Sequence, residues 1–336
     1  MRAILTIITS AITLLGAFTA QAQPPASAIT VAQDGSGQFS SIQAAINSVR
    51  DLSQQPVIIF IKPGIYTEKL VIPTWKTHIT LLGQSPENTI ITGADYSGKP
   101  YPNGIAHTTG LTSFNTYTSY TVLVQGSHCR LQNLTIQNTA GRVGQAVALH
   151  IEGNQVAVYN CHLLGNQDTL YAATAQSLQY YYHCYIQGTT DFIFGEATAL
   201  FEDCTIKSLS TSYIPAAATS PRQRYGFVFL KCRLIAADTS ATRVYLGRPW
   251  RPHAQTVFLH CYLGPHIVPE GWHHWPGDAM FPNKEKTCYY AEYQSQGPGA
   301  NPAGRVAFSH QLNSRQAKNY TPGQVLAGWQ PTPATP

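Results

Sequence analysis

The feature that most constrains the fold is a series of short apolar runs that recurs every 20 to 29 residues. A series of residues stands near the start of these runs: Asn133, Cys161, Cys184, Cys204, Cys232 and Cys261. A repeat of this length, with β-type runs and no helical periodicity, is typical of a solenoid of strands. We therefore predict an all-β fold, a parallel β-helix whose coils stack at the strand spacing of about 4.8 Å.

Three polar residues within this series are evenly spaced. Gln145 precedes Asp168 by 23 residues, and Asp168 precedes Asp191 by another 23. If 23 residues make one coil, the three side chains form a column on one outer face of the solenoid. Equally spaced Asp and Asn residues also occur in solenoid turns for structural reasons. That reading is preferred for any one of the three, whereas the set of three indicates a site.

The segments around the repeat predict a cap and a cleft. Residues 42–49 follow an apolar i, i+3, i+4, i+7 pattern with Ser40 or Ser41 as N-cap, which predicts a short helix that shields the open end of the core. Residues 93–120 and 208–224 lack long apolar runs and are expected to be loops that build a cleft. We expect one catalytic domain over residues 23–336.

The N-terminal segment predicts export. Residues 1–22 combine Arg2, an apolar stretch and a small-residue site, Ala20-Gln21-Ala22, as in a secretory signal peptide. Its removal lowers the formal net charge from +5 to +4. Charged residues make up only 11% of the chain and form no basic patch, which argues against a nucleic-acid partner. We expect no membrane span and a secreted, monomeric protein, extracellular or periplasmic.

The polar residues suggest ester chemistry. Two carboxyls one strand spacing apart are not easily ionised together, so one can act as an acid while the other is a nucleophile or base. Arg248 is the candidate cation that keeps Asp191 charged; its alternative role is structural packing on Trp250. Gln145 and Gln167 supply N–H donors that suit an oxyanion, although they could equally form a ladder along the solenoid.

Five motifs, in this order along the chain, resemble those of the pectin methylesterase (pectinesterase) family, of the secreted bacterial type. They are Gly64-x-Tyr66-x-Glu68, Gln145 to Leu149, Gln167 to Leu170, Asp191 to Gly195, and Leu246 to Trp250. The resemblance implies a right-handed parallel β-helix. It also implies hydrolysis of the C6 methyl esters of homogalacturonan (pectin) to pectate and methanol.

The resemblance further implies a role for each matched residue. Asp191 would be the nucleophile and Asp168 the acid and base, with Gln145 and Gln167 as oxyanion donors and Arg248 holding the nucleophile. Trp250 would stack on the sugar. The residues expected to line the same cleft are Tyr171, Phe192 and Trp272. No cofactor is implied, and no spacing among the 12 histidines indicates a metal site.

Other functions remain open at this point. Paired carboxylates about 5 Å apart also suit a retaining glycosidase acting on polygalacturonate. A non-catalytic β-helix adhesin would have no need of both Asp residues and Arg248. A family member adapted to another ester or a thioester is the third alternative, which the loops over residues 93–120 and 208–224 would decide.

Seven cysteines in an exported chain suggest at least one disulfide. Cys184 and Cys204 stand at equivalent places on consecutive coils, where stacked Cα atoms lie within disulfide range. We predict this bridge, with a ladder of buried reduced thiols as its alternative. Cys161, Cys232 and Cys261 are expected to be reduced and buried.

Overall fold

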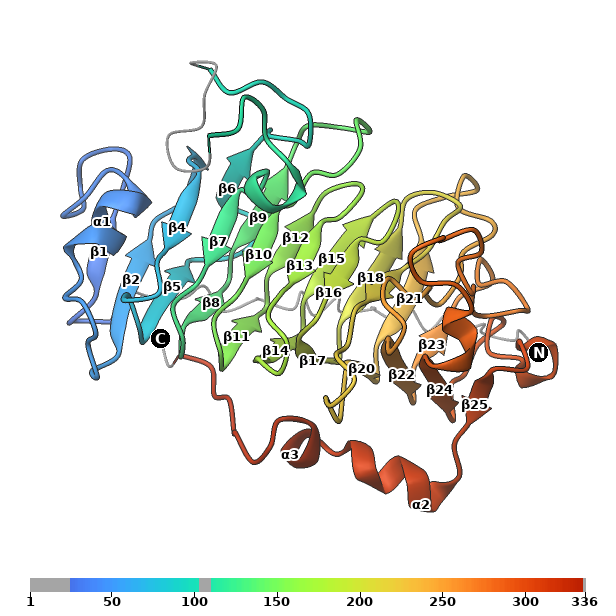
Figure 1. Cartoon of the computed structure of the whole chain (residues 1–336). Helices are drawn as coiled ribbons and strands as arrows, with labels where there is room; N and C mark the ends of the chain where they lie inside the picture. Colours follow the sequence, from blue (N-terminus) through green and yellow to red (C-terminus); the bar gives the residue numbers. More distant parts are fainter. Residues whose placement is uncertain (1–24, 103–109, 335–336) are drawn as a thin grey trace, which may run out of the picture.

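The computed structural model describes residues 25–102 and 110–334 of the chain. These residues wind into the predicted right-handed parallel β-helix, and every pairing between the named strands is parallel (Figure 1). The signal peptide predicted for residues 1–22 lies outside the described residues, as does part of the first long loop, residues 103–109.

Three sheets run along the helix, and each coil contributes up to one strand to each sheet. Sheet A has eleven strands: β1 (Ile29–Val31), β2 (Val57–Ile61), β5 (Ile79–Gly83), β8 (Arg130–Gln132), β11 (Val156–Tyr159), β14 (Leu178–Tyr182), β17 (Thr198–Glu202), β20 (Phe227–Leu230), β22 (Gln255–Leu259), β24 (Tyr289–Tyr293) and β25 (Ser309–Gln311).

The other two sheets are shorter. Sheet B has eight strands: β3 (Gly64–Thr67), β6 (Thr89–Gly93), β9 (Thr135–Asn138), β12 (His162–Leu164), β15 (Tyr185–Gly188), β18 (Thr205–Ser208), β21 (Arg233–Ala236) and β23 (Tyr262–Leu263). Sheet C has six strands: β4 (Leu70–Ile72), β7 (Val122–Val124), β10 (Leu149–Ile151), β13 (Leu170–Ala172), β16 (Ile193–Gly195) and β19 (Pro215–Ala217).

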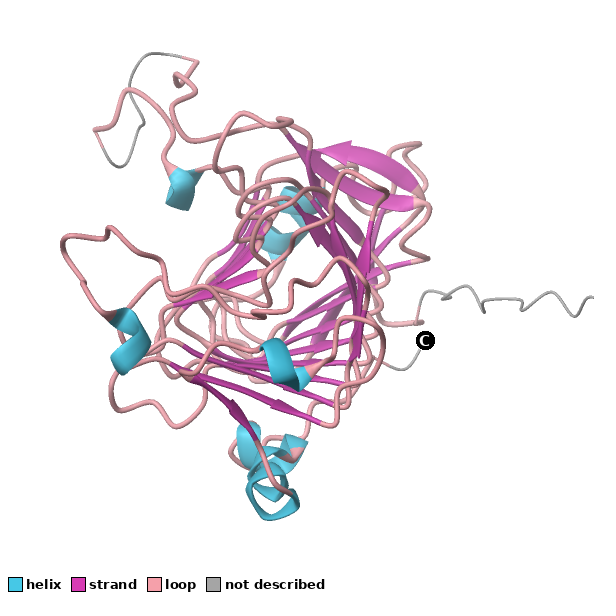
Figure 2. Ribbon diagram, turned by 90° about the vertical axis from the view of Figure 1, so that its right-hand side faces the viewer, coloured by secondary structure: helices cyan, strands magenta, loops and turns pink. Residues whose placement is uncertain are grey.

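The inward faces of the sheets share one apolar core, which the strands enclose when the stack is seen from one end (Figure 2). Equivalent core positions of successive coils hold like residues, so their side chains stack. Tyr181, Phe201, Phe229 and Phe258 form such a row, with neighbouring ring centroids 4.4–4.6 Å apart. Repetition of the same side chain at each strand spacing thus builds the core.

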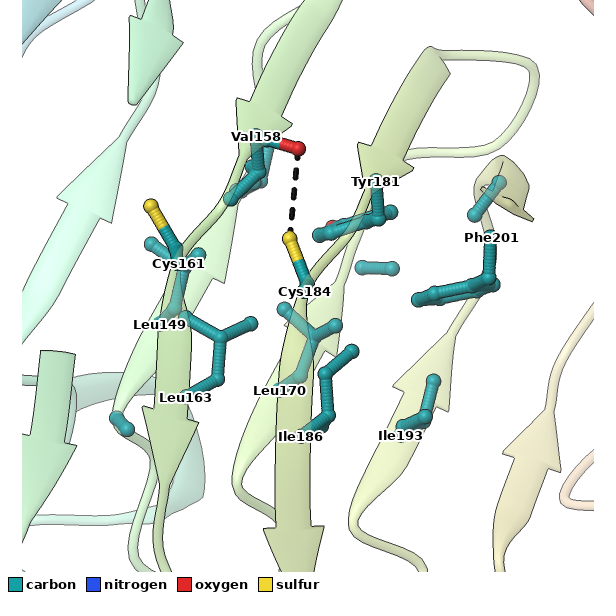
Figure 3. Close-up of a cluster of buried hydrophobic side chains, with 14 of the residues drawn as sticks. Leu149, Val158, Cys161, Leu163, Leu170, Tyr181, Cys184, Ile186, Ile193 and Phe201 are labelled. Atoms are coloured by element: carbon teal, nitrogen blue, oxygen red, sulfur yellow. Dashed lines mark hydrogen bonds between the residues drawn. The ribbon is translucent and has the colours of Figure 1, made fainter. Parts of the chain in front are cut away.

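The cysteines form a second row in this core, and the predicted Cys184–Cys204 disulfide is wrong. All seven cysteines are free and buried. The Cys184 Sγ lies 3.4 Å from the Val158 carbonyl oxygen, and the Cys204 Sγ lies 3.4 Å from that of Tyr181 (Figure 3). Each thiol therefore contacts a backbone carbonyl of the preceding coil. Cys161, Cys232 and Cys261 are buried and reduced, as predicted.

The capping helix is confirmed as α1 (Ile42–Ser48), with Ser41 as its N-cap. Its apolar side Ile42, Ala45 and Ile46 is buried in the core. The Glu68 carboxylate accepts hydrogen bonds from the Ile42 and Gln43 amides at 2.9 and 3.1 Å, which satisfies amides that a helix N-terminus leaves free. The Gly64-x-Tyr66-x-Glu68 motif thus has a structural role.

The remaining helices are short and lie outside the stack. They are η1 (Thr116–Thr118), η2 (Lys284–Lys286), η3 (Pro302–Gly304), α2 (Ser314–Ala317), η4 (Lys318–Tyr320) and α3 (Pro322–Val325). After β25 the chain turns back through α2 and α3 and runs along the outer face of sheet A (Figure 1). Val325 and Leu326 pack there against the outward side chains of the strands.

Candidate active site

Asp168 and Asp191 occupy the same place on consecutive coils, two residues before β13 and β16. The register pairs Leu170 with Ile193, so the two carboxyls are one strand spacing apart, about 4.8 Å. Both residues have left-handed backbone, with φ of 65° and 47°, and both are 7% exposed. Asp tolerates this conformation better than bulkier residues. The positive φ turns the chain from sheet B into sheet C at the point where each carboxyl stands.

The predicted column is correct for the two Asp residues and wrong for Gln145. The backbone of Gln145 pairs with Gln167 rather than with Asp168. The reason is the coil length, because β10 and β13 are in register at a step of 21 residues, from Leu149 to Leu170. Gln145 and Gln167 therefore lie side by side, and among the described residues neither side-chain amide has a hydrogen-bond partner. Both face the cleft that holds the carboxyls.

Arg248 binds Asp191 through two hydrogen bonds. Its Nε donates to Oδ1 at 2.9 Å and its Nη2 donates to Oδ2 at 2.6 Å. The guanidinium also lies 3.6 Å from the ring centroid of Trp275 and 4.0 Å from that of Tyr213. The structural alternative, packing on Trp250, is not what the fold shows, because the cation over Trp250 is Arg251. A bidentate pair fixes the orientation of the Asp191 carboxylate.

The two carboxyls have different electrostatic surroundings. Burial raises the pKa of Asp168 well above its usual value, and the neighbouring Asp191 raises it further, against the opposing charge of Arg248. Burial also raises the pKa of Asp191, but the hydrogen bonds and charge of Arg248, together with Lys284, act in the opposite direction. The arrangement therefore favours a protonated Asp168 beside an ionised Asp191.

Both carboxyls open into a cleft of about 270 Å³. Its lining comprises Thr116, Tyr117, Gln145, Gln167, Asp168, Asp191, Phe194, Ala216, Arg248, Trp250 and Trp275. Trp250 lies in it as predicted. Tyr171 stands behind this wall at 8% exposure, with its ring stacked on Phe194 at 4.5 Å and tilted against Tyr117 at 5.6 Å. It supports the two lining rings instead of forming the surface.

Two predicted lining residues are wrong. Phe192 is fully buried, because the left-handed turn at Asp191 directs the next side chain inward. It packs against Gly188, where an added Cβ would come within 2.2 Å of the Phe192 Cβ. Trp272 is 1% exposed and stacks on Tyr290 in the core at 4.3 Å. Neither ring reaches the cleft.

Three cleft residues were not predicted. Trp275 follows Trp272 by three residues, and it is the second tryptophan of the Trp-His-His-Trp run that faces the site. Thr116 and Tyr117 belong to η1 in the first long loop, which the sequence marks only as a loop. The adjacent rings of His273 and His274 stack at 5.4 Å rather than diverging. Over residues 25–102 and 110–334, no three His, Cys, Asp or Glu side chains cluster as metal ligands would.

A parallel β-helix with an arginine-held carboxylate beside a second buried carboxyl, under free amide donors, defines the pectinesterases. The chain belongs to this family: the Pectinesterase family model matches residues 28–329. Among curated relatives, pectinesterase 31 of Arabidopsis thaliana is 37% identical over 87% of this chain and 90% of its own length. A probable pectinesterase/pectinesterase inhibitor 58 of the same plant is 35% identical over 92% of this chain.

Solved structures agree with this assignment. A pectin methylesterase from carrot has a TM-score of 0.81 and 33% identity, covering 92% of this chain and 95% of its own. PemA of Erwinia chrysanthemi has a TM-score of 0.80 and 29% identity, covering 93% and 99%. The chain spans about half the length of several curated relatives, 54% of the one named above. Since the similar proteins come from both plants and bacteria, the bacterial type stays a prediction.

Proposed function

We propose that the protein hydrolyses the C6 methyl esters of homogalacturonan, releasing methanol and leaving pectate. The single observation that carries this proposal is the unequal carboxyl pair. Asp191 is held by two hydrogen bonds from Arg248, and Asp168 lies one coil away with a pKa raised by burial. One carboxyl can thus attack while the other supplies a proton, which is what ester cleavage requires.

In the first step, an Asp191 oxygen attacks the ester carbonyl carbon and forms a tetrahedral oxyanion. The unpartnered amides of Gln145 and Gln167 face the cleft and are positioned to donate to this oxygen. The bond from the carbonyl carbon to the methoxy oxygen then breaks, and Asp168 gives its proton to the leaving oxygen. Methanol departs, and the acyl group stays on Asp191 as an anhydride.

In the second step, a water molecule replaces methanol. Asp168, now ionised, removes a proton from the water as the oxygen attacks the acyl carbon. The bond between the acyl carbon and the Asp191 oxygen breaks, which frees the product acid and restores the ionised Asp191. Asp168 ends the cycle protonated. Arg248 keeps Asp191 oriented throughout, because both of its hydrogen bonds are to the nucleophile.

An aromatic surface supports a sugar polymer as the substrate. Trp250, Phe194, Tyr117 and Trp275 line the cleft beside the carboxyls. A pectin methylesterase that is 29% identical to this chain has been solved in complex with a hexasaccharide. We infer that several sugar rings of one chain contact this surface, with one ester group at the carboxyl pair. The protein is proposed to act as a monomer.

Methanol release from highly methylated pectin tests the proposal. The purified protein should release methanol without creating new reducing ends. A glycosidase acting on polygalacturonate would do the reverse, and release of neither product would point to a binding module. If a different ester or a thioester were cleaved and pectin were not, the family chemistry would hold with another substrate.

We also propose that the protein works outside the cell. The support is the basic start, apolar stretch and small-residue site within residues 1–22. In the described part of the chain, no helix is long and apolar enough to cross a membrane. N-terminal sequencing of the exported protein should find a new start after Ala22. Recovery of the intact N-terminus from the cytosol would contradict export.

A further inference from the structure

A second cavity lies on sheet A, whereas the catalytic cleft lies beside sheet C. It has a volume of about 200 Å³ and is bounded on one side by β5 and β8 and on the other by the C-terminal tail. Arg130, His78, His128 and Trp329 are among its lining residues. The tail is held in place near Arg130, because the Ala334 amide donates to the Gln132 Oε1 at 2.8 Å.

The register explains why there is space around Arg130. On the two neighbouring strands its partners are Thr80 and Ala157, both small, so the longer Arg130 side chain has room on each side. The guanidinium Nε is buried and has no hydrogen-bond partner. Among the described residues, no carboxylate pairs with Arg130. A half-buried cation without a partner is costly, and a bound anion would relieve that cost.

The rest of the pocket suits a ring with hydroxyl groups. His78 and His128 stack with centroids 4.7 Å apart, and the His78 Nδ1 lies 3.0 Å from the Ser53 carbonyl oxygen. If that nitrogen carries the proton, the His78 Nε2 is left as an acceptor. Trp329 adds an aromatic surface from the tail. The cavity thus combines one cation, imidazole nitrogens and an indole, and its volume is near that of a single sugar ring.

We propose that this pocket, which we call the Arg130 pocket, binds a uronate, a sugar acid whose carboxylate pairs with Arg130 and whose ring lies against Trp329. Guanidinium and carboxylate form charge-assisted hydrogen bonds that are among the stronger ones in proteins. The site is separate from the catalytic machinery, since none of its lining residues lines the cleft. The proposal does not depend on the esterase activity, because binding is measured directly.

Isothermal titration with galacturonate tests the Arg130 pocket, and Arg130→Met is the main variant. Arg233→Met is the matched control, because Arg233 also projects outward from a strand but lies on sheet B, over Tyr262. Wild type and Arg233→Met should bind galacturonate with equal affinity, and Arg130→Met should bind at least about tenfold more weakly. Methanol release by both variants should stay within about twofold of wild type.

Two further measurements define the ligand and the location. Galactose, which lacks the carboxylate, should not bind detectably. The cleft variant Trp250→Ala should keep the galacturonate binding that depends on Arg130. Absence of binding to wild type, equal affinity in Arg130→Met, or loss of binding in Trp250→Ala would each overturn the proposal. Binding of inorganic phosphate but not galacturonate would also overturn it, by showing that the pocket takes a small anion without a ring.

Discussion

The Arg248 guanidinium lies 3.6 Å from the ring centroid of Trp275, and the same ring has the Lys284 ammonium at 4.5 Å. Lys284 is 1% exposed, and its ammonium pairs with Asp278 at 2.8 Å. The catalytic arginine is therefore supported by a segment far along the chain. Because Arg248 in turn holds Asp191, Trp275 and Lys284 influence the nucleophile without touching it.

Trp275→Ala should reduce turnover by about ten- to a hundredfold, since loss of the ring frees Arg248 and disturbs the carboxylate that it orients. Initial rates of methanol release on pectin measure this. Trp329→Ala is the control, because this tryptophan lines the Arg130 pocket and should leave the rate unchanged. Equal rates for wild type and Trp275→Ala would show that the ring is not needed to place Arg248.

Lys284→Met should move the acid limb of the activity profile to higher pH. The positive charge of Lys284 lowers the pKa of Asp191, so its removal raises that pKa and the nucleophile becomes protonated at a higher pH. The measurement is the pH dependence of kcat/KM from pH 3 to 9. Asp278→Asn keeps the lysine and is the comparison. An acid limb that stays in place would limit Lys284 to packing.

Asp191→Asn should lower the turnover number by about a thousandfold or more, because the amide is a poor nucleophile and no longer pairs with Arg248 as an anion. Circular dichroism should show an unchanged β-sheet spectrum. The variant should still bind methylated oligogalacturonate, because the aromatic lining is intact. Substantial methanol release by the folded variant would remove Asp191 from the nucleophile role.

Asp168→Asn should slow methyl ester hydrolysis by about 10² to 10⁴-fold, since methanol then leaves without its proton. An ester with a more acidic alcohol needs less protonation, so the variant's first step should be partly rescued with a trifluoroethyl ester. In wild type the raised pKa of Asp168 should place the loss of activity on the alkaline side, as this proton dissociates. An equal defect for both esters would argue against proton donation.

Gln145→Ala and Gln167→Ala should each reduce kcat by about 10² to 10³-fold with little change in KM, as expected for donors to a transition-state oxyanion. Gln137→Ala is a suitable control, because Gln137 lies on sheet B and donates to Thr92. A rise in KM with unchanged kcat would instead mean that the amides bind the ground-state substrate.

All seven cysteines should be unreactive in the native protein and fully alkylated after unfolding without reductant. The reason is that each thiol is buried and none is bridged. Burial also raises the pKa of Cys184 and Cys204 well above the usual value, which suppresses the reactive thiolate. Mass spectrometry of the alkylated chain counts the thiols. Recovery of fewer than seven would indicate a disulfide after all.

The sequence by itself determined the architecture. Runs of apolar residues at steps of 20 to 29 residues, each near a Cys or Asn, can bury their apolar faces only if the coils stack, so the repeat predicts the solenoid. It also identified the carboxyl pair, because a 23-residue step is one coil and equivalent positions then align. The capping helix was readable from its apolar pattern and its serine N-cap.

Only the tertiary structure decided which way particular side chains face. The 21-residue step between Leu149 and Leu170 moves Gln145 out of the Asp column and beside Gln167. The left-handed turn at Asp191 sends Phe192 into the core. Trp275, not Trp272, reaches the cleft. Coil length and turn conformation set these directions, and both depend on contacts between distant segments, whereas the repeat depends on local pattern alone.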